Sequence, residues 1–107
     1  MNRYLEVLNQ SFDKVVIALN DKEGRAEVHV VYLVKQDENK LCFDVEEGST
    51  LFDALHEHGY VSLIGVNDRV SIKVNGFVLC VGDSNVKGKM LFCIEKGKGE
   101  FRDAINH

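Results

Sequence analysis

The sequence predicts a mainly β protein, an antiparallel barrel with a few short helices, and three observations support this prediction. Short runs rich in β-branched and aromatic residues recur along the chain, separated by turns that contain Gly, Asn or Asp. Helical spacing of apolar residues is confined to the first residues and to the stretch that follows Val45. The 107 residues contain no proline, no repeat and no linker. We therefore expect one domain, spanning residues 1–107, whose strands form mostly sequential hairpins.

The chain begins with a predicted amphipathic helix and a hairpin. Within MNRYLEVLNQ, the residues Leu5, Val7 and Leu8 share one face, which we expect to pack on the core. Lys14–Asn20 and Ala26–Lys35 are apolar runs on either side of an Asp-Lys-Glu-Gly turn. This arrangement predicts that the two runs pair as antiparallel strands.

A strand followed closely by a helix is predicted in the middle of the chain. Lys40–Val45 alternates its apolar residues onto one face, as a half-buried strand does. Gly48, Ser49 and Thr50 then open a short helix. The free N–H groups and the dipole of a helix N-terminus attract anions, so this junction is the main candidate for ligand binding.

The remaining strands are predicted from apolar runs in the second half of the chain. These runs are Val61–Val66, Ser71–Val81, Met90–Glu95 and Gly99–Asp103. Asn67 and Asp68 indicate the turn between the first two, and Lys96–Lys98 indicates the turn between the last two. The Asn75-Gly76 pair inside the long run predicts a bulge or a bend.

Charge and cysteine content exclude several functions. The net charge is −4, and nucleic acid is not expected as a partner because clustered Lys and Arg hold phosphate backbones. No segment is long and apolar enough to span a membrane, and the first residues do not resemble a signal peptide. Cys42, Cys80 and Cys93 are widely spaced among apolar neighbours, which predicts reduced, buried thiols and a cytoplasmic location. No CxxC pair occurs, so no metal site is predicted.

Five consecutive segments carry a resemblance to a known family. They are VVIALNDKEGRAE, VHVVYLVK, ENKLCFDVEEGSTLFDALHEHGYVSLIG, VSIKVNGFVLCVGD and MLFCIEKGKGEFRD. In order and spacing they resemble the small FMN-binding split-barrel proteins of the pyridoxamine-5'-phosphate-oxidase-like superfamily. The resemblance covers nearly the whole chain. It implies an antiparallel split β-barrel that forms a homodimer and holds FMN in grooves between the two barrels.

The resemblance also implies where the flavin is held. The second strand and the end of the third strand, with the turn after it, would contact the cofactor. The corresponding positions here are His29, Val30, Val31, Val45, Glu46, Ser49 and Thr50. No catalytic side chain is implied, because in such proteins the cofactor carries the chemistry.

The chain departs from the family at the positions that bind phosphate. Glu27 or His29 stands where an arginine is usual, and no lysine accompanies Ser49. Glu46 and Glu47 bring two like charges to this position, at a cost on the order of several kcal/mol unless a cation offsets them. The cations that we consider for this role are Arg25, Arg69 and Lys73.

The candidates have structural interpretations as well, and two functions remain open. His29 would serve as a hydrogen-bonded strand residue, and Ser49 as a helix N-cap. The first function is a flavin-dependent oxidoreductase that transfers electrons or hydride between a nicotinamide and a small acceptor. The second is a non-catalytic split-barrel dimer that has lost FMN and acts as a binding or regulatory module. The sequence does not distinguish FMN from a deazaflavin or haem.

The apolar residues expected to meet the partner subunit are Val28, Val30, Tyr32 and Val78.

Overall fold

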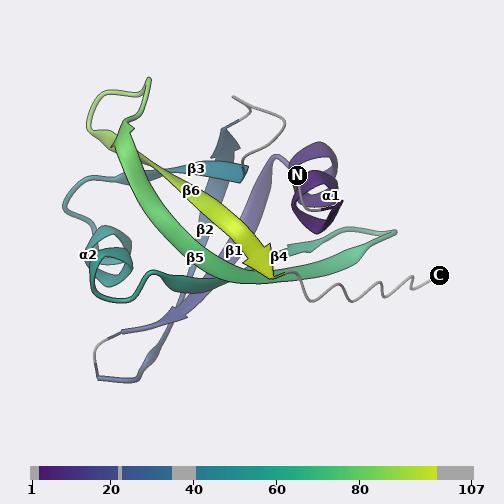
Figure 1. Ribbon diagram of the computed structural model, residues 1–107, viewed down its shortest axis with the longest axis horizontal. Coiled ribbons are helices and arrows are strands. Elements are labelled where there is room, and N and C mark those ends of the chain that lie inside the picture. The colour runs from purple at the N-terminus through teal and green to yellow at the C-terminus, as the bar shows by residue number, and fades with distance from the viewer. Residues whose placement is uncertain (1–2, 22, 35–40, 99–107) are drawn as a thin grey trace.

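The computed structural model describes residues 3–21, 23–34 and 41–98. The elements in this part of the chain are α1 (Arg3–Ser11), β1 (Lys14–Asn20), β2 (Ala26–Val34), β3 (Leu41–Glu46), α2 (Thr50–Glu57), β4 (Tyr60–Val66), β5 (Ser71–Asp83) and β6 (Lys89–Lys98) (Figure 1). The element types and their order agree with the sequence prediction. The last predicted strand, Gly99–Asp103, lies outside the described residues.

The strands close into a barrel in the order β1-β2-β3-β6-β5-β4, with β4 pairing back onto β1. Every pairing is antiparallel. Most pairs join strands that follow one another in the chain, and the β3–β6 and β1–β4 pairs close the circle. The predicted antiparallel barrel is therefore confirmed.

Side chains from alternate strand positions fill the barrel. In β1 the residues at every second position are buried, and β4 shows the same pattern. Phe43 of β3 and Phe92 of β6 are cross-strand neighbours that stack with ring centroids 6.2 Å apart, and Phe43 is fully buried. Val78, which we expected on an exposed apolar face, is 4% exposed and belongs to this core. That expectation was wrong because Val78 continues the inward alternation of Ile72 and Val74 along β5.

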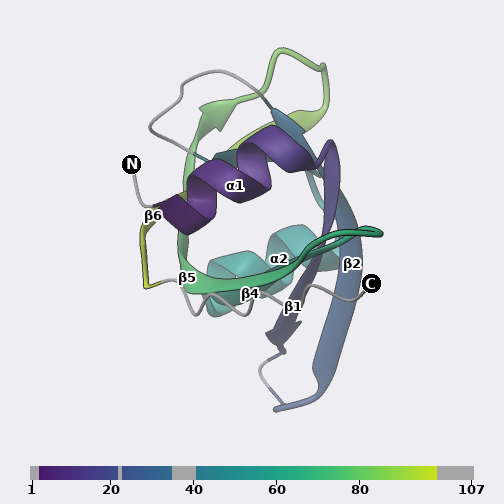
Figure 2. The same ribbon diagram turned by 90° about the vertical axis from the view of Figure 1, so that its right-hand side faces the viewer.

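The two helices cover opposite ends of the barrel (Figures 1 and 2). Leu8 of α1 and Phe12, which directly follows the helix, pack over Gly65 of β4. A Cβ on Gly65 would lie 2.7 Å from the Phe12 ring, so glycine allows this close approach. α2 buries Leu51 and Leu55 against the other end, as the apolar spacing predicts. No described helix is long and apolar enough to cross a membrane.

The long β5 pairs with β6 through two irregularities. A register shift lies between Asn75 and Phe77, which confirms the predicted bulge, and a second lies between Cys80 and Gly82. The predicted turn at Lys96–Lys98 is wrong, because β6 continues through these residues and pairs Lys98 with Asn75. The length of β5 explains the difference, since this strand offers a partner to residues that would otherwise form a loop.

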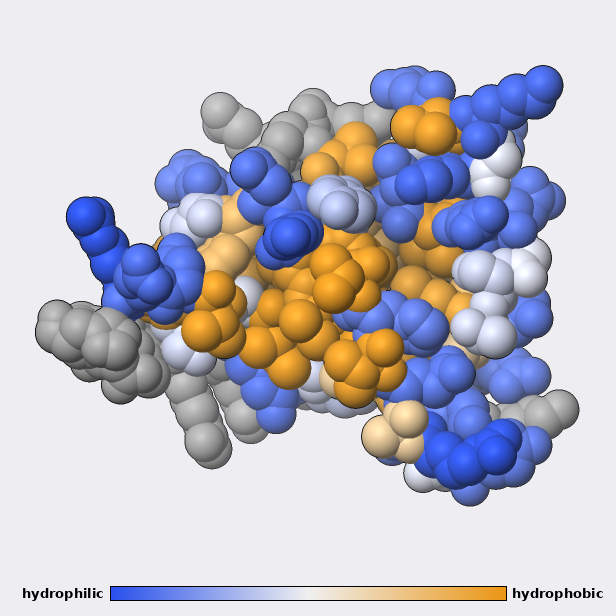
Figure 3. Space-filling model, turned by 180° about the vertical axis from the view of Figure 1, so that it is seen from behind, coloured by the Kyte–Doolittle hydropathy of each residue, from blue (hydrophilic) through white to orange (hydrophobic). Residues whose placement is uncertain are grey.

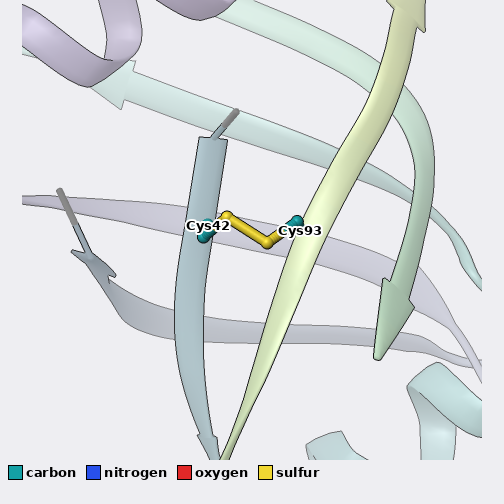
Figure 4. The surroundings of a disulfide bond; sticks show 2 residues. All are labelled: Cys42 and Cys93. Carbon is teal, nitrogen blue, oxygen red and sulfur yellow. A yellow bond between two sulfur atoms is a disulfide. The ribbon is translucent and has the colours of Figure 1, made fainter. Parts of the chain in front are cut away.

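Two of the three cysteines form a disulfide bond, so the prediction of reduced, buried thiols was wrong. Cys42 and Cys93 are directly opposite on β3 and β6, with Cα atoms 4.1 Å apart (Figure 4). Leu91 packs beside them. Cys80 is a free thiol and is exposed. β3 and β6 are far apart in the sequence, and their pairing brings the two cysteines together. The compartment inferred from reduced cysteines therefore loses its basis.

Candidate functional site: a groove between β2 and β3

The barrel is split between β2 and β3. β2 pairs with β1 along its length, from Ala26 to Tyr32. Within the described part of the chain, its pairing with β3 is confined to Leu33 and Val34. The part of β2 before these residues therefore has no β3 partner along one edge.

The open edge of β2 presents hydrogen-bonding groups of the main chain. The N–H of Leu33 donates to the Asp13 carbonyl on the β1 side, over 2.9 Å. Main-chain groups of successive strand residues point to opposite sides. The N–H and C=O groups of Val30 and Val28 are therefore directed away from β1, toward the split. An extended polar edge of a ligand can pair with them as a further strand would.

A groove of about 230 Å³ lies in this split. The residues that line it are His29, Val30, Val31, Tyr32, Asp44, Val45, Glu46, Ser49, Thr50, Leu51 and Lys89. All seven site residues named from the sequence are among them. The fold therefore brings these seven residues together, and their role in binding remains a prediction.

The start of α2 forms one end of the groove. Gly48 has a φ of +80°, a left-handed conformation that favours glycine, and it turns the chain from β3 into the helix. The Ser49 hydroxyl accepts a hydrogen bond from the Phe52 N–H at 3.1 Å, so the N-cap interpretation of Ser49 is confirmed. Helix geometry leaves the N–H groups of Thr50 and Leu51 without acceptors inside the helix. These residues line the groove, and their N–H groups suit an anion.

The charged groups of the groove come from β3 and β6. Asp44 accepts a hydrogen bond from the Ser84 hydroxyl. Glu46 is exposed at the end of β3, and Lys89 stands directly opposite it on β6. Glu47 does not line the groove. Lys89 is the cation that the sequence analysis missed. No local signal identifies it, because the β3–β6 pairing joins distant segments.

His29 lies on the inward side of β2. Its Nε2 is 3.7 Å from a carboxylate oxygen of Glu27 and is buried without a hydrogen-bond partner. The side chain is 29% exposed. The expected hydrogen bond is therefore missing at Nε2, although the residue is partly exposed as predicted. Among the described residues, no group of His, Cys, Asp and Glu side chains is arranged to hold a metal ion.

The outer surface beside the groove is apolar. We call it the β2–β1–β4 face; its members are Val28, Val30, Tyr32, Val16, Ala18, Ile64 and Val66. Val30, Val16 and Ile64 are cross-strand neighbours in one row. Val28 is 64% exposed, Val30 58% and Val66 67%. Figure 3 shows apolar side chains gathered at the middle of the side opposite to the view in Figure 1, between polar margins. Val30 and Tyr32 belong to both the face and the groove.

The architecture is that of solved split barrels. A NimC/NimA family protein from Clostridium acetobutylicum matches with a TM-score of 0.74 over 92% of this chain and 84% of its own, at 19% identity. A pyridoxamine 5'-phosphate oxidase-related, FMN-binding protein from Nostoc punctiforme matches with a TM-score of 0.68, over 87% and 76%, at 10% identity. A heme storage protein from Vibrio cholerae matches with a TM-score of 0.66, over 88% of each chain, at 14% identity.

No family model matches the sequence, and no curated protein matches it. The structural similarity therefore establishes the fold. The chain has the split β-barrel fold of the solved pyridoxamine 5'-phosphate oxidase-related proteins, as the sequence resemblance predicts.

Proposed function

We propose that this protein is a homodimer that binds FMN in the groove between β2 and β3 and uses it to transfer electrons or hydride to a small acceptor. One observation carries the proposal: the split in the barrel gathers all seven residues that the sequence resemblance assigned to the flavin. The same architecture occurs in an FMN-binding protein from Nostoc punctiforme.

The groups in the groove fit the two ends of FMN. The flavin ring system carries alternating N–H and C=O groups along one edge, and the open main chain of Val30 offers complementary groups. The phosphate matches the free N–H groups of Thr50 and Leu51, which lie at the positive end of the α2 dipole. Lys89 adds a full positive charge to the same groove.

The size of the groove supports the homodimer. Its volume of about 230 Å³ is below the roughly 300–1,000 Å³ that is typical of pockets for such ligands. Val30 and Tyr32 connect the groove to the β2–β1–β4 face. A second copy of this chain seated on that face would add a wall to the groove and would cover the exposed valines.

The bound flavin would supply the redox chemistry, and the chain would supply position and environment. The main chain of Val30 would orient the ring system, and the start of α2 would fix the phosphate. Val30 and apolar residues of the partner subunit would keep water from the ring. We assign no catalytic side chain, and a nicotinamide would approach from the open side of the groove.

The alternative is a split-barrel dimer that does not hold flavin and serves as a binding module. The observation that favours it is the pair of carboxylates in the groove, Asp44 and Glu46, with no arginine beside them. A heme storage protein also has this fold. Haem is therefore the second ligand that a binding test must include.

The test is a titration of the purified protein with FMN and, separately, with haem, followed by removal of unbound ligand and measurement of molecular mass. We expect retained FMN near one per chain at the mass of a dimer. Hydride transfer is then tested by anaerobic addition of NADH or NADPH and by loss of flavin absorbance. A dimer that retains neither ligand would favour the binding-module alternative. Retention of haem without FMN would refute the flavin assignment.

A further inference from the structure

Lys89 is a cation placed on the groove by a strand that the sequence resemblance does not implicate. It begins β6, directly opposite Glu46 at the end of β3. Its side chain lines the groove together with the start of α2. No ion pair joins Lys89 to any acidic residue of the described chain, although Glu46 is its cross-strand neighbour. The ammonium charge is therefore available to a ligand.

The main chain around Lys89 is held by its neighbours. Its N–H donates to the Val86 carbonyl at 3.1 Å, and its carbonyl accepts from the Ser84 N–H at 3.0 Å. Ser84 also donates its hydroxyl hydrogen to Asp44, which ties the β5–β6 connection to β3. Gly88, with a φ of +84°, permits the turn that leads into Lys89. These bonds fix the backbone position from which the Lys89 side chain extends.

A main-chain hydrogen bond also joins the β5–β6 connection to the turn before α2. The Glu47 N–H donates to the Gly88 carbonyl at 3.0 Å. The residue preceding Lys89 is thereby bonded to the turn that leads into the helix. The lysine and the free N–H groups of Thr50 and Leu51 line the same groove. Together they offer a positive charge and two N–H donors to one anion.

Two carboxylates near Lys89 compete with a ligand for its positive charge. Asp44 is engaged by Ser84, and Glu46 is exposed to water. Water screens the exposed charge of Glu46 more than it would screen a charge inside the groove. A dianionic phosphate outweighs the single carboxylate of Glu46 in attracting Lys89, whereas an uncharged end of a ligand does not.

We infer that Lys89 is the specificity-determining residue for the phosphate of the flavin, in place of the arginine and lysine that the sequence resemblance leads us to expect near His29 and Ser49. The inference rests on the proposed function and refines it. The groove would distinguish a flavin with a phosphate ester from one that ends in a hydroxyl. The ligand class is therefore a phosphorylated flavin, and riboflavin is the matched ligand that lacks the recognised group.

The experiment measures dissociation constants for FMN and for riboflavin, by quenching of flavin fluorescence, in four proteins. These are the wild type and the variants Lys89→Gln, Lys89→Arg and Lys87→Gln. Lys87 is an exposed lysine of the same connection and does not line the groove, so its variant is the matched control. Losing a charge-assisted hydrogen bond to phosphate is expected to weaken FMN binding by about 10- to 100-fold.

The inference predicts that Lys89→Gln weakens FMN binding by this factor and leaves riboflavin binding within about twofold, while Lys89→Arg and Lys87→Gln resemble the wild type. Equal losses for both flavins would overturn the inference, because they would mean a structural role for Lys89. Unchanged FMN binding in Lys89→Gln would also overturn it, and so would a wild type that binds both flavins equally. Each of these three results would leave the proposed flavin function intact. A wild type that binds neither flavin removes the proposed function and this inference together.

Discussion

Replacing Val28 with aspartate tests whether the β2–β1–β4 face is the dimer interface. Val28 is 64% exposed, lies beside Ala18 of β1 and does not line the groove. Burying a whole valine side chain stabilises by about 1.5 kcal/mol or more, so covering this exposed part contributes about 1 kcal/mol. A twofold dimer buries the residue twice, which gives about 2 kcal/mol. This corresponds to roughly a 30-fold change in the dimer dissociation constant, before the cost of burying a carboxylate is added.

Sedimentation equilibrium of the ligand-free protein at several concentrations measures this constant. Val86→Asp is the control, because Val86 is 48% exposed in the β5–β6 connection and lies outside the β2–β1–β4 face. We expect Val28→Asp to shift the protein toward monomer while its circular dichroism stays that of the wild type. We expect Val86→Asp to leave the dimer intact. A dimer as tight in Val28→Asp as in the wild type would refute this assignment of the interface.

Three further predictions concern charge and covalent structure. Glu46→Lys should tighten FMN binding, because it replaces a like charge beside the phosphate with a cation; unchanged affinity in a titration would contradict the position of the phosphate. Titration of the unreduced protein should find one reactive thiol, and replacing Cys42 and Cys93 with serine should lower the free energy of unfolding by about 4 kcal/mol, from the 51-residue separation of the pair. Three reactive thiols would contradict the disulfide. The main-chain N–H of Arg25, together with its guanidinium, lowers the pKa of Asp21 below its usual value of 3.8. The stabilisation from the Asp21 carboxylate is therefore present at neutral pH and is lost as pH falls through the lowered pKa. Asp21→Asn should destabilise at pH 7 and have no effect in acid; an equal loss at both pH values in thermal unfolding would contradict this.

Local patterns were sufficient to predict most elements of the barrel. The apolar runs Lys14–Asn20 and Ala26–Lys35, on either side of a turn, gave a hairpin, and small polar residues before Leu51 gave a capped helix. These features depend on neighbours within a few residues, where sequence spacing and spatial proximity coincide. The bulge near Asn75 was found for the same reason, since Asn-Gly inside a strand has a local conformational cause.

Features that depend on pairing between distant strands were missed. The β3–β6 register brings Cys42 against Cys93 and Glu46 against Lys89. Each partner is ordinary in its own segment, so no local signal marks either pair. Val78 was assigned to the surface although it shares the inward phase of Ile72 and Val74 in β5. The seven positions that the resemblance named line one groove, but the resemblance could not supply a cation that is contributed by another strand.

We propose that the groove between β2 and β3 holds FMN in a dimer. The first measurement to make is an absorbance spectrum of the protein after incubation with excess FMN and gel filtration on a column calibrated for molecular mass. We expect retained flavin bands corresponding to one FMN per chain, eluting with the dimer. A protein that elutes free of flavin after incubation with saturating FMN, at the mass of the monomer or of the dimer, would contradict this proposal.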